Sequence, residues 1–170
     1  NSRAEVERFL PHINVPEDKY HVTHNGVDTT FFSPVSADIF ISHFGIEQPF
    51  VLCVGNIENR KNQSVLLEAA SISGVHVVLV GNIRDAQYYR NLENRFYGKF
   101  SYLGYLEHDS EMLRSAYSAC SVFALPSLLE TPGLAALEAA AERAAAERAA
   151  ALEAAKLALA ADVAADFAAA

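Results

Sequence analysis

The chain has 170 residues and a formal net charge of −8, from 13 Lys and Arg against 21 Asp and Glu. This length corresponds to about one domain and suffices to bury a substantial apolar core. The negative charge argues against general binding to nucleic acid or to anionic membranes, because both need clustered Lys and Arg.

The first part of the chain predicts short elements. A helix is expected over Arg3–Leu10 and a short strand over Tyr20–Thr23, followed by a turn at residues 24–26. A second short helix is expected over Ala37–Phe44. The histidines at 21 and 24 do not amount to a metal site, which needs three or four ligands.

From residue 50 the pattern becomes regular, with apolar runs that alternate with amphipathic segments. The predicted strands are Phe50–Val54, Val75–Val80, Phe100–Leu103 and Ser121–Leu125. The predicted helices are one that opens at Asn62 with Val65, Leu66, Ala69 and Ala70 on one face, then Asp85–Tyr97, then Asp109–Ser118 with Asp109 as its N-cap. Continuous apolar strands alternating with helices predict an α/β fold, a Rossmann-like parallel sheet with helices on both faces.

Two cysteines, Cys53 and Cys120, lie within the apolar runs VLCVG and ACSVFAL. We expect reduced core residues rather than a disulfide or metal-binding pair. Without an apolar run of roughly 18 residues or an N-terminal signal pattern, a soluble cytoplasmic protein is the expectation.

The last segment is rich in alanine, which makes up 21 of the 36 residues from Ala135 to Ala170. Alanine is the best helix former, so a long C-terminal helix is predicted, with residues 1–138 as the α/β domain and 139–170 as a helical extension. Repeated Glu-Arg-Ala units resemble designed helix filler, and we interpret the segment as an engineered cap or extension. A natural low-complexity tail, or alanines that stand for unidentified side chains, are the alternatives. An apolar stripe through Leu152, Leu159, Val163 and Phe167 suggests that this helix packs against something, such as another copy of the chain.

Two loops at the carboxyl ends of strands carry the candidate chemistry, because that edge of an open parallel sheet is where ligands bind. The first runs from Gly55 to Asn62 and holds the adjacent cations Arg60 and Lys61. These cations could bind a phosphate group. The alternative is an ordinary solvated loop with two surface cations.

The second loop covers residues 126–133 and leads into the last helix. Thr131 can cap that helix, with Pro132 at its first position, which leaves the N–H groups around Gly133 and Leu134 free for an anion. Glu138 lies one to two turns further on, where an exposed acid favoured by the helix dipole is the alternative. Glu130 beside an anion site is unfavourable unless it binds something, such as sugar hydroxyls.

The ordered set of motifs resembles the C-terminal domain of retaining family 4 glycosyltransferases, which have the GT-B fold. The matching segments run in the family's order from about Tyr20 to Ala140 and are HNGVD with FSP (24–28 and 32–34), VG through KN (54–62), YLG followed by Glu111, Leu113 and Tyr117 (102–117), and PS with the E-x7-E stretch ETPGLAALE (126–138). One departure is Asn56, where the family usually has arginine, so Arg60 would take over that charge.

The resemblance implies roles for individual residues. Arg60 and Lys61, beside Gly55, would hold the diphosphate of a nucleotide-sugar donor, and the backbone at Gly133 and Leu134 would support the phosphate or sugar. Glu130 would contact the transferred sugar as the catalytic residue, and Glu138 would bind the ribose hydroxyls. No metal or cofactor is expected.

The resemblance also implies a missing partner, the N-terminal domain that holds the acceptor. The leading hypothesis is thus the donor-binding domain of a hexosyltransferase that uses a UDP-, GDP- or ADP-sugar and is inactive or nearly so alone. The alternative is an engineered scaffold or assembly component built on a glycosyltransferase fragment.

Overall fold

A computed structural model describes residues 3–13, 15–130 and 133–169 of the chain. Within these residues, four parallel strands form one sheet in the order β3-β2-β1-β4. The strands are β1 (Phe50–Val54), β2 (His76–Val80), β3 (Phe100–Tyr102) and β4 (Val122–Phe123). The predicted parallel sheet is confirmed, with some strands shorter than expected at their ends.

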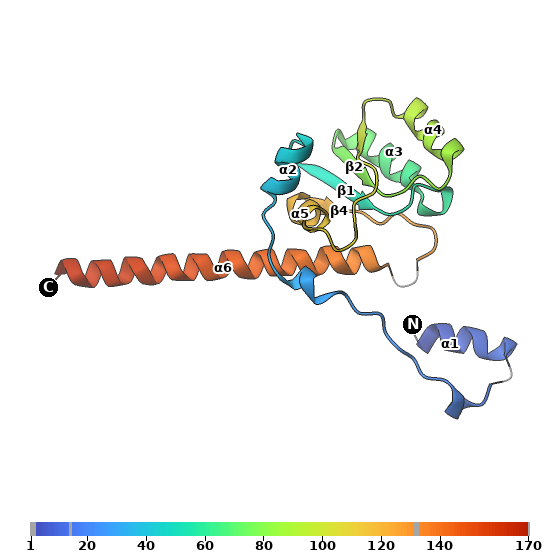
Figure 1. Cartoon of the computed structure of the whole chain (residues 1–170), viewed down its shortest axis with the longest axis horizontal. Coiled ribbons are helices and arrows are strands. Elements are labelled where there is room, and N and C mark those ends of the chain that lie inside the picture. Colours follow the sequence, from blue (N-terminus) through green and yellow to red (C-terminus); the bar gives the residue numbers. More distant parts are fainter. Residues whose placement is uncertain (1–2, 14, 131–132, 170) are drawn as a thin grey trace.

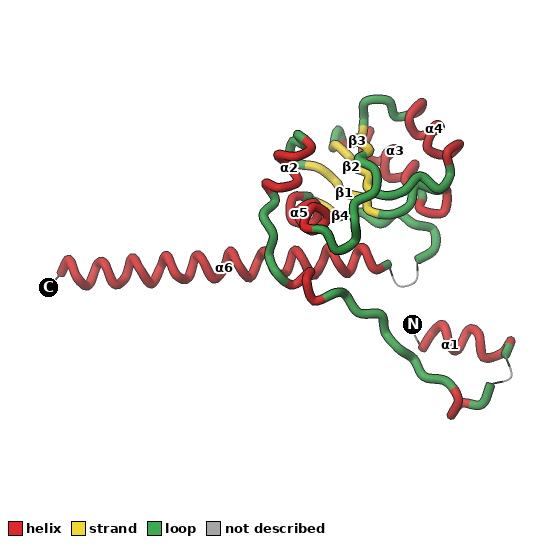
Figure 2. Tube along the Cα trace, in the orientation of Figure 1, coloured by secondary structure: helices red, strands yellow, loops and turns green. Residues whose placement is uncertain are grey.

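Helices flank the sheet on both faces and extend from it at both ends of the chain (Figures 1 and 2). The α-helices are α1 (Arg3–Phe9), α2 (Asp38–Phe44), α3 (Gln63–Ser73), α4 (Ala86–Arg95), α5 (Glu111–Ala119) and α6 (Leu134–Ala169). Short 3₁₀ turns are η1 (Leu10–His12), η2 (Glu17–Lys19), η3 (Thr29–Phe32) and η4 (Asn59–Lys61). In the described part of the chain, no helix has the length and apolar character needed to cross a membrane.

The sheet separates two apolar cores, because side chains alternate between the faces of a strand. In β1, Phe50 and Leu52 point to the core shared with α2, α5, α6 and η3, whereas Cys53 points to the core shared with α3 and α4. Every residue of β2 from Val77 to Val80 is buried, alternating between the same two cores. Both cysteines are buried and free, as predicted.

The C-terminal helix α6 is continuous, so the predicted boundary between residues 138 and 139 lies inside it. Ala139 and Ala141 belong to the core, and Glu142 is fully buried. The Glu142 carboxylate accepts a hydrogen bond from the Val35 N–H at 3.1 Å and lies 3.3 Å from Nε of Arg114. The α/β domain therefore includes at least the next two turns of helix, and the rest of α6 projects away from the body (Figure 1).

Several local predictions were wrong or fall outside the described residues. Tyr20–Thr23 forms no strand; it belongs to an extended segment that separates α1 from the sheet (Figure 1). On α3 the buried face is rotated, since Val65 and Ala69 are exposed while Gln63 is buried. The N-cap of α5 is Ser110, whose hydroxyl accepts from the Leu113 N–H at 3.1 Å, rather than Asp109. Thr131 and Pro132, predicted as the cap and first residue of α6, lie outside the described residues.

Candidate functional site

The two predicted loops flank the point where the chain reverses its direction across the sheet. From β1 the chain builds outward through β2 to β3, then returns to place β4 on the other side of β1. At such a topological switch point, neighbouring loops at the carboxyl ends of the strands diverge and leave a crevice for ligands. Here the strands on either side of the switch point are β1 and β4.

The loop after β1 is anchored against the end of β2. The Gly55 N–H donates to the Val80 carbonyl at 2.8 Å, and the Ile57 N–H donates to the Asn82 carbonyl at 2.8 Å. Gly81 has φ +143°, and a Cβ on it would lie 2.1 Å from the carbonyl oxygen of Gly55. A side chain at position 81 is therefore sterically incompatible with this loop.

The loop then places the cations through a short 3₁₀ turn. Asn62 follows η4 and adopts the left-handed conformation, with φ +56°, before α3 begins. Gln63, fully buried at the start of α3, donates from Nε2 to the Asn56 carbonyl at 2.9 Å. This tie fixes the path between the glycine and the cations Arg60 and Lys61.

Backbone and side-chain hydrogen bonds join the loop after β1 to the loop after β4. The Leu128 N–H donates to the Arg60 carbonyl at 2.9 Å, and the Arg60 guanidinium donates to the Leu129 carbonyl at 3.0 Å. The Asn62 side chain donates to the Pro126 carbonyl at 3.2 Å. The two loops therefore form one wall of the site, although some 65 residues separate them in the sequence.

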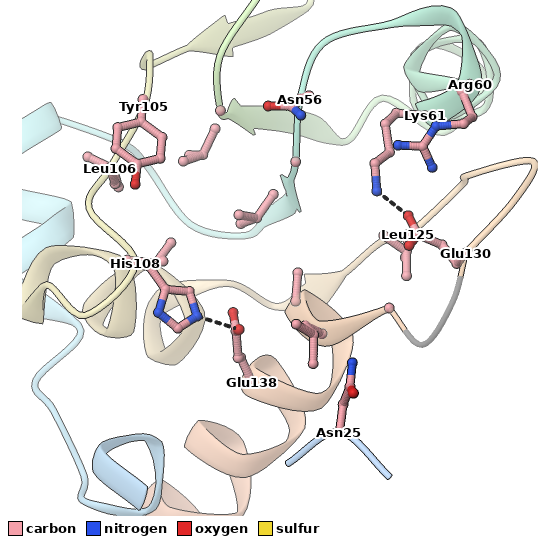
Figure 3. Close-up of a pocket in the computed structure, with 18 residues that line it drawn as sticks. Asn25, Asn56, Arg60, Lys61, Tyr105, Leu106, His108, Leu125, Glu130 and Glu138 are labelled. Atoms are coloured by element: carbon pink, nitrogen blue, oxygen red, sulfur yellow. Dashed lines mark hydrogen bonds and ion pairs between the residues drawn. The ribbon is translucent and has the colours of Figure 1, made fainter. Parts of the chain in front are cut away.

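This wall ends in an ion pair between Lys61 and Glu130 (Figure 3). The side chains of Lys61 and Glu130 are only 16% and 23% exposed, so Lys61 is not a surface cation. Partial burial alone would raise the pKa of Glu130. Hydrogen bonds from Lys61 and Ser127, together with the charges of Lys61 and Arg60, outweigh that effect and hold the pKa below its ordinary value. Arg60 is 48% exposed and pairs with Glu58 at 2.8 Å.

The opposite wall is the first part of α6 with the loop after β3. Gly133 has φ +69°, which favours glycine, and a Cβ there would lie 3.0 Å from Leu125. The N–H groups of Leu134 and Ala135 belong to the first turn of α6, where a helix has no acceptors of its own.

Glu138 is only 5% exposed, so it is not the exposed helix acid of the alternative interpretation. Its Oε1 lies 2.7 Å from Nε2 of His108, and its Oε2 accepts a hydrogen bond from the Tyr117 hydroxyl at 2.9 Å. Burial and then the charge of Glu138 raise the pKa of Tyr117 far above its ordinary value, so the hydroxyl stays protonated.

A pocket of about 520 Å³ lies between the two walls (Figure 3). All seven residues predicted as site residues line it: Gly55, Arg60, Lys61, Glu130, Gly133, Leu134 and Glu138. The sequence interpretation missed other lining residues, among them Asn25, Tyr105, Leu106 and His108. Tyr105, Leu106 and His108 follow β3, and Asn25 precedes η3. These positions were the only signal in the sequence that could have placed the four residues near this edge of the sheet.

The architecture defines an α/β domain of the doubly wound type with a pocket at its switch point, and comparison with known proteins gives its family. Residues 36–145 match the model of the family described as Glycosyl transferases group 1. The chain therefore belongs to this glycosyltransferase family.

Among curated relatives, the D-inositol 3-phosphate glycosyltransferase of Mycolicibacterium smegmatis is 31% identical over 150 residues, which cover 83% of this chain and 34% of the relative. The protein of the same name from Mycobacteroides abscessus is 26% identical over 156 residues, with the same coverage. Among solved structures, sucrose-phosphate synthase from Thermosynechococcus elongatus aligns with a TM-score of 0.66 and 26% identity, covering 80% of this chain and 36% of that one. The chain thus spans about a third of the length of the relatives it matches.

Proposed function

We propose that this chain is the donor-binding domain of a retaining hexosyltransferase of family 4, and that its pocket holds a UDP-, GDP- or ADP-sugar. One observation carries the proposal: the loops after β1 and β4 converge, so that Lys61 meets Glu130 directly across from the start of α6 (Figure 3). Membership of the Glycosyl transferases group 1 family supports it.

The diphosphate of such a donor is the leaving group, and negative charge develops on it as the glycosidic bond breaks. Fixed positive groups aimed at those oxygens stabilise the transition state. In this pocket they are Lys61, Arg60 and the first N–H groups of α6, where the helix dipole also favours an anion. These groups supply the positive charge without a metal ion, and we propose that the site works without one.

Glu130 lies at the cationic end of the pocket, held by Lys61 and Ser127. We propose that it is the residue that contacts the transferred sugar, which is attached to the phosphate that Lys61 binds. A donor phosphate would compete with Glu130 for Lys61 and would release carboxylate lone pairs toward the sugar hydroxyls. The lowered pKa of Glu130 keeps its carboxylate ionised, so that it accepts hydrogen bonds.

Glu138 lies on the other wall, and we propose that it accepts hydrogen bonds from the ribose hydroxyls of the donor. The pocket volume of about 520 Å³ is within the range of about 300–1,000 Å³ of small-molecule sites. A diphosphate bound at Lys61 would then place the nucleoside toward Glu138 on the opposite wall of the same pocket.

The acceptor-binding domain is the proposed partner of this chain. The relatives are about three times as long as the part of them that this chain matches. Because transfer needs donor and acceptor to be positioned together, we expect nucleotide binding but little or no sugar transfer by these 170 residues alone.

A nucleotide titration of the full chain, followed by NMR, tests the proposal. UDP, GDP or ADP should shift the amide resonances of Arg60, Lys61, Gly133 and Glu138. Lys61→Ala should abolish these shifts, while Lys99→Ala, which removes an exposed lysine just before β3, should preserve them. If all three nucleotides leave the four resonances unmoved at saturating concentration, donor binding by this domain is refuted.

We further propose that α6 beyond residue 145 is an engineered or appended extension of the family domain. The family match ends at residue 145, Ala145 is buried, and Leu152 beyond it is 57% exposed. Deletion of residues 150–170 should leave the free energy of unfolding unchanged within about 0.5 kcal/mol. A larger loss would show that the extension packs on the domain, and light scattering would show whether it joins copies of the chain.

A further inference from the structure

The wall of the pocket opposite Lys61 is built around one buried carboxylate (Figure 3). The side chain of Glu138 is 6% exposed, and each of its oxygens has one ring as a partner, His108 at 2.7 Å and Tyr117 at 2.9 Å. Burying a carboxylate is costly unless its oxygens are hydrogen-bonded. The two rings therefore give each oxygen of Glu138 a hydrogen-bond partner and fix its orientation.

The two rings differ in their access to the pocket. Tyr117 is 2% exposed on α5, packed within the core between the sheet and α6. His108, in the loop between β3 and α5, has a side chain that is 58% exposed and lines the pocket beside Glu138. His108 is thus the partner of Glu138 that a bound molecule would meet.

A third ring fixes the orientation of the other two. Phe31, in η3, is fully buried and packs edge-on against His108 at 5.6 Å between centroids and against Tyr117 at 6.0 Å. The imidazole therefore has a packed support on one side and its hydrogen bond to Glu138 on the other.

We propose that His108 is a positioning residue for the donor, and this inference rests on the proposed function. By holding Oε1 of Glu138, it keeps the carboxylate in the orientation that receives the ribose hydroxyls. Each carboxylate oxygen has lone pairs for a second hydrogen bond, so the contact with His108 does not block the ligand. Without it, part of the binding free energy is lost in ordering the carboxylate.

Two substitutions separate hydrogen bonding from packing. His108→Phe keeps a ring against Phe31 but removes the N–H donor, whereas His108→Gln removes the ring but supplies an amide donor. The probe is whichever of UDP, GDP and ADP binds the unmodified chain most tightly. We expect His108→Phe to weaken its binding about tenfold, the scale of a hydrogen bond to a charged group, and His108→Gln to recover most of that loss. A packing role predicts the opposite order.

Two further probes locate the effect at the ribose. The 2′,3′-dideoxy counterpart of the nucleotide, which lacks both hydroxyls, should bind His108→Phe and the unmodified chain equally. The affinity for inorganic pyrophosphate should be unchanged by His108→Phe, whereas Lys61→Ala should abolish pyrophosphate binding. Exposed His12, in η1, provides the matched control, and His12→Ala should change no affinity.

The positioning role is overturned if His108→Phe binds the nucleotide as tightly as the unmodified chain does. It is also overturned if His108→Phe weakens binding of the dideoxy nucleotide by the same factor as binding of the nucleotide itself. Both results leave donor binding intact. Failure of the unmodified chain to bind any of the three nucleotides would instead refute the proposed function, and the role of His108 with it.

Discussion

Glu130 and Glu138 are the two ends of one E-x7-E motif, eight positions apart, yet the fold gives them opposite surroundings. Glu130 lies on a loop, with its side chain 23% exposed and paired with Lys61 and Ser127. Glu138 lies on α6, with its side chain 6% exposed and held by His108 and Tyr117. The first wall is therefore made of loops and paired charged side chains, and the second is a helix whose carboxylate is held by two rings.

The difference shows how one pocket can serve two parts of a ligand. An anion that reaches Lys61 must compete with a carboxylate already there, so the partners on the loop wall are exchangeable. The partners of Glu138 need not be displaced, because they leave acceptor lone pairs available. We therefore expect substitutions of the charged side chains on the loop wall to change anion binding. Substitutions around Glu138 on the helix wall should change stability and nucleoside binding.

The largest expected effect is on the frame of the loop wall. Gly81→Ala places a Cβ 2.1 Å from the Gly55 carbonyl, which should cost at least about 3 kcal/mol of the free energy of unfolding. Denaturant unfolding measures it. Gly26→Ala is the matched control, because nothing lies within 4 Å of its Cβ position. Equal stability of the two variants would show that the Gly55 loop does not pack as described.

Removal of one hydroxyl from each wall compares the two carboxylates directly. Tyr117→Phe deletes a buried donor to Glu138 and should cost about 1.5–3 kcal/mol of the free energy of unfolding. Ser127→Ala deletes the donor to the more exposed Glu130 and should cost less than about 0.5 kcal/mol. Equal losses in thermal or denaturant unfolding would contradict the contrast between the walls.

The reactivity of the two buried cysteines measures how often the core around each of them opens to solvent. Burial, opposed by the charge of Lys61, raises the pKa of Cys53 in β1 to about 12. Burial, opposed by Arg143, raises that of Cys120 after α5 to about 11. The folded state therefore favours the protonated thiols, a contribution that is present at neutral pH and is lost as pH rises toward these values. At pH near 7.5 we expect neither thiol to react with a thiol reagent until the chain opens, and fast labelling of the native chain would contradict this burial.

The smallest expected effect is on the titration of Glu130. Its pKa lies below the ordinary value, so its contribution to stability is present above that ordinary value and is lost as pH falls through the lowered one. An NMR titration of the Glu130 carboxyl carbon should show the low midpoint, and Lys61→Ala should move the midpoint upward. An unchanged midpoint would mean that the ion pair does not form in solution.

The sequence predicts the centre of this fold better than its edges. Strands β1 and β2 are buried on both faces and leave continuous apolar runs, which are easily recognised. The Tyr20–Thr23 segment has residue types that favour strands, but among the described residues it has no neighbouring strand to pair with. On α3, tertiary packing overrides the apolar periodicity of the sequence. The polar side chain of Gln63 is buried because it donates a hydrogen bond to the Asn56 carbonyl in the loop after β1.

The candidate site follows the same division. The cations and glutamates were predicted from their places after the strands and from the family motif, and the fold brings them into one pocket. His108 carries no such signal, since its role comes from contacts with Phe31, 77 residues earlier, and Glu138, 30 residues later. Glu142 was likewise hidden, because a glutamate within an alanine repeat resembles an exposed residue until the helix packs on α5.

The most direct test is a crystal structure of the chain with bound UDP, GDP or ADP. We expect the diphosphate on Lys61 near the first turn of α6, the ribose hydroxyls on Glu138, and the contact between His108 and Glu138 preserved. Nucleotide bound elsewhere, or a pocket in which Lys61 still pairs with Glu130 at saturating nucleotide, would contradict the assignment of this pocket to the donor.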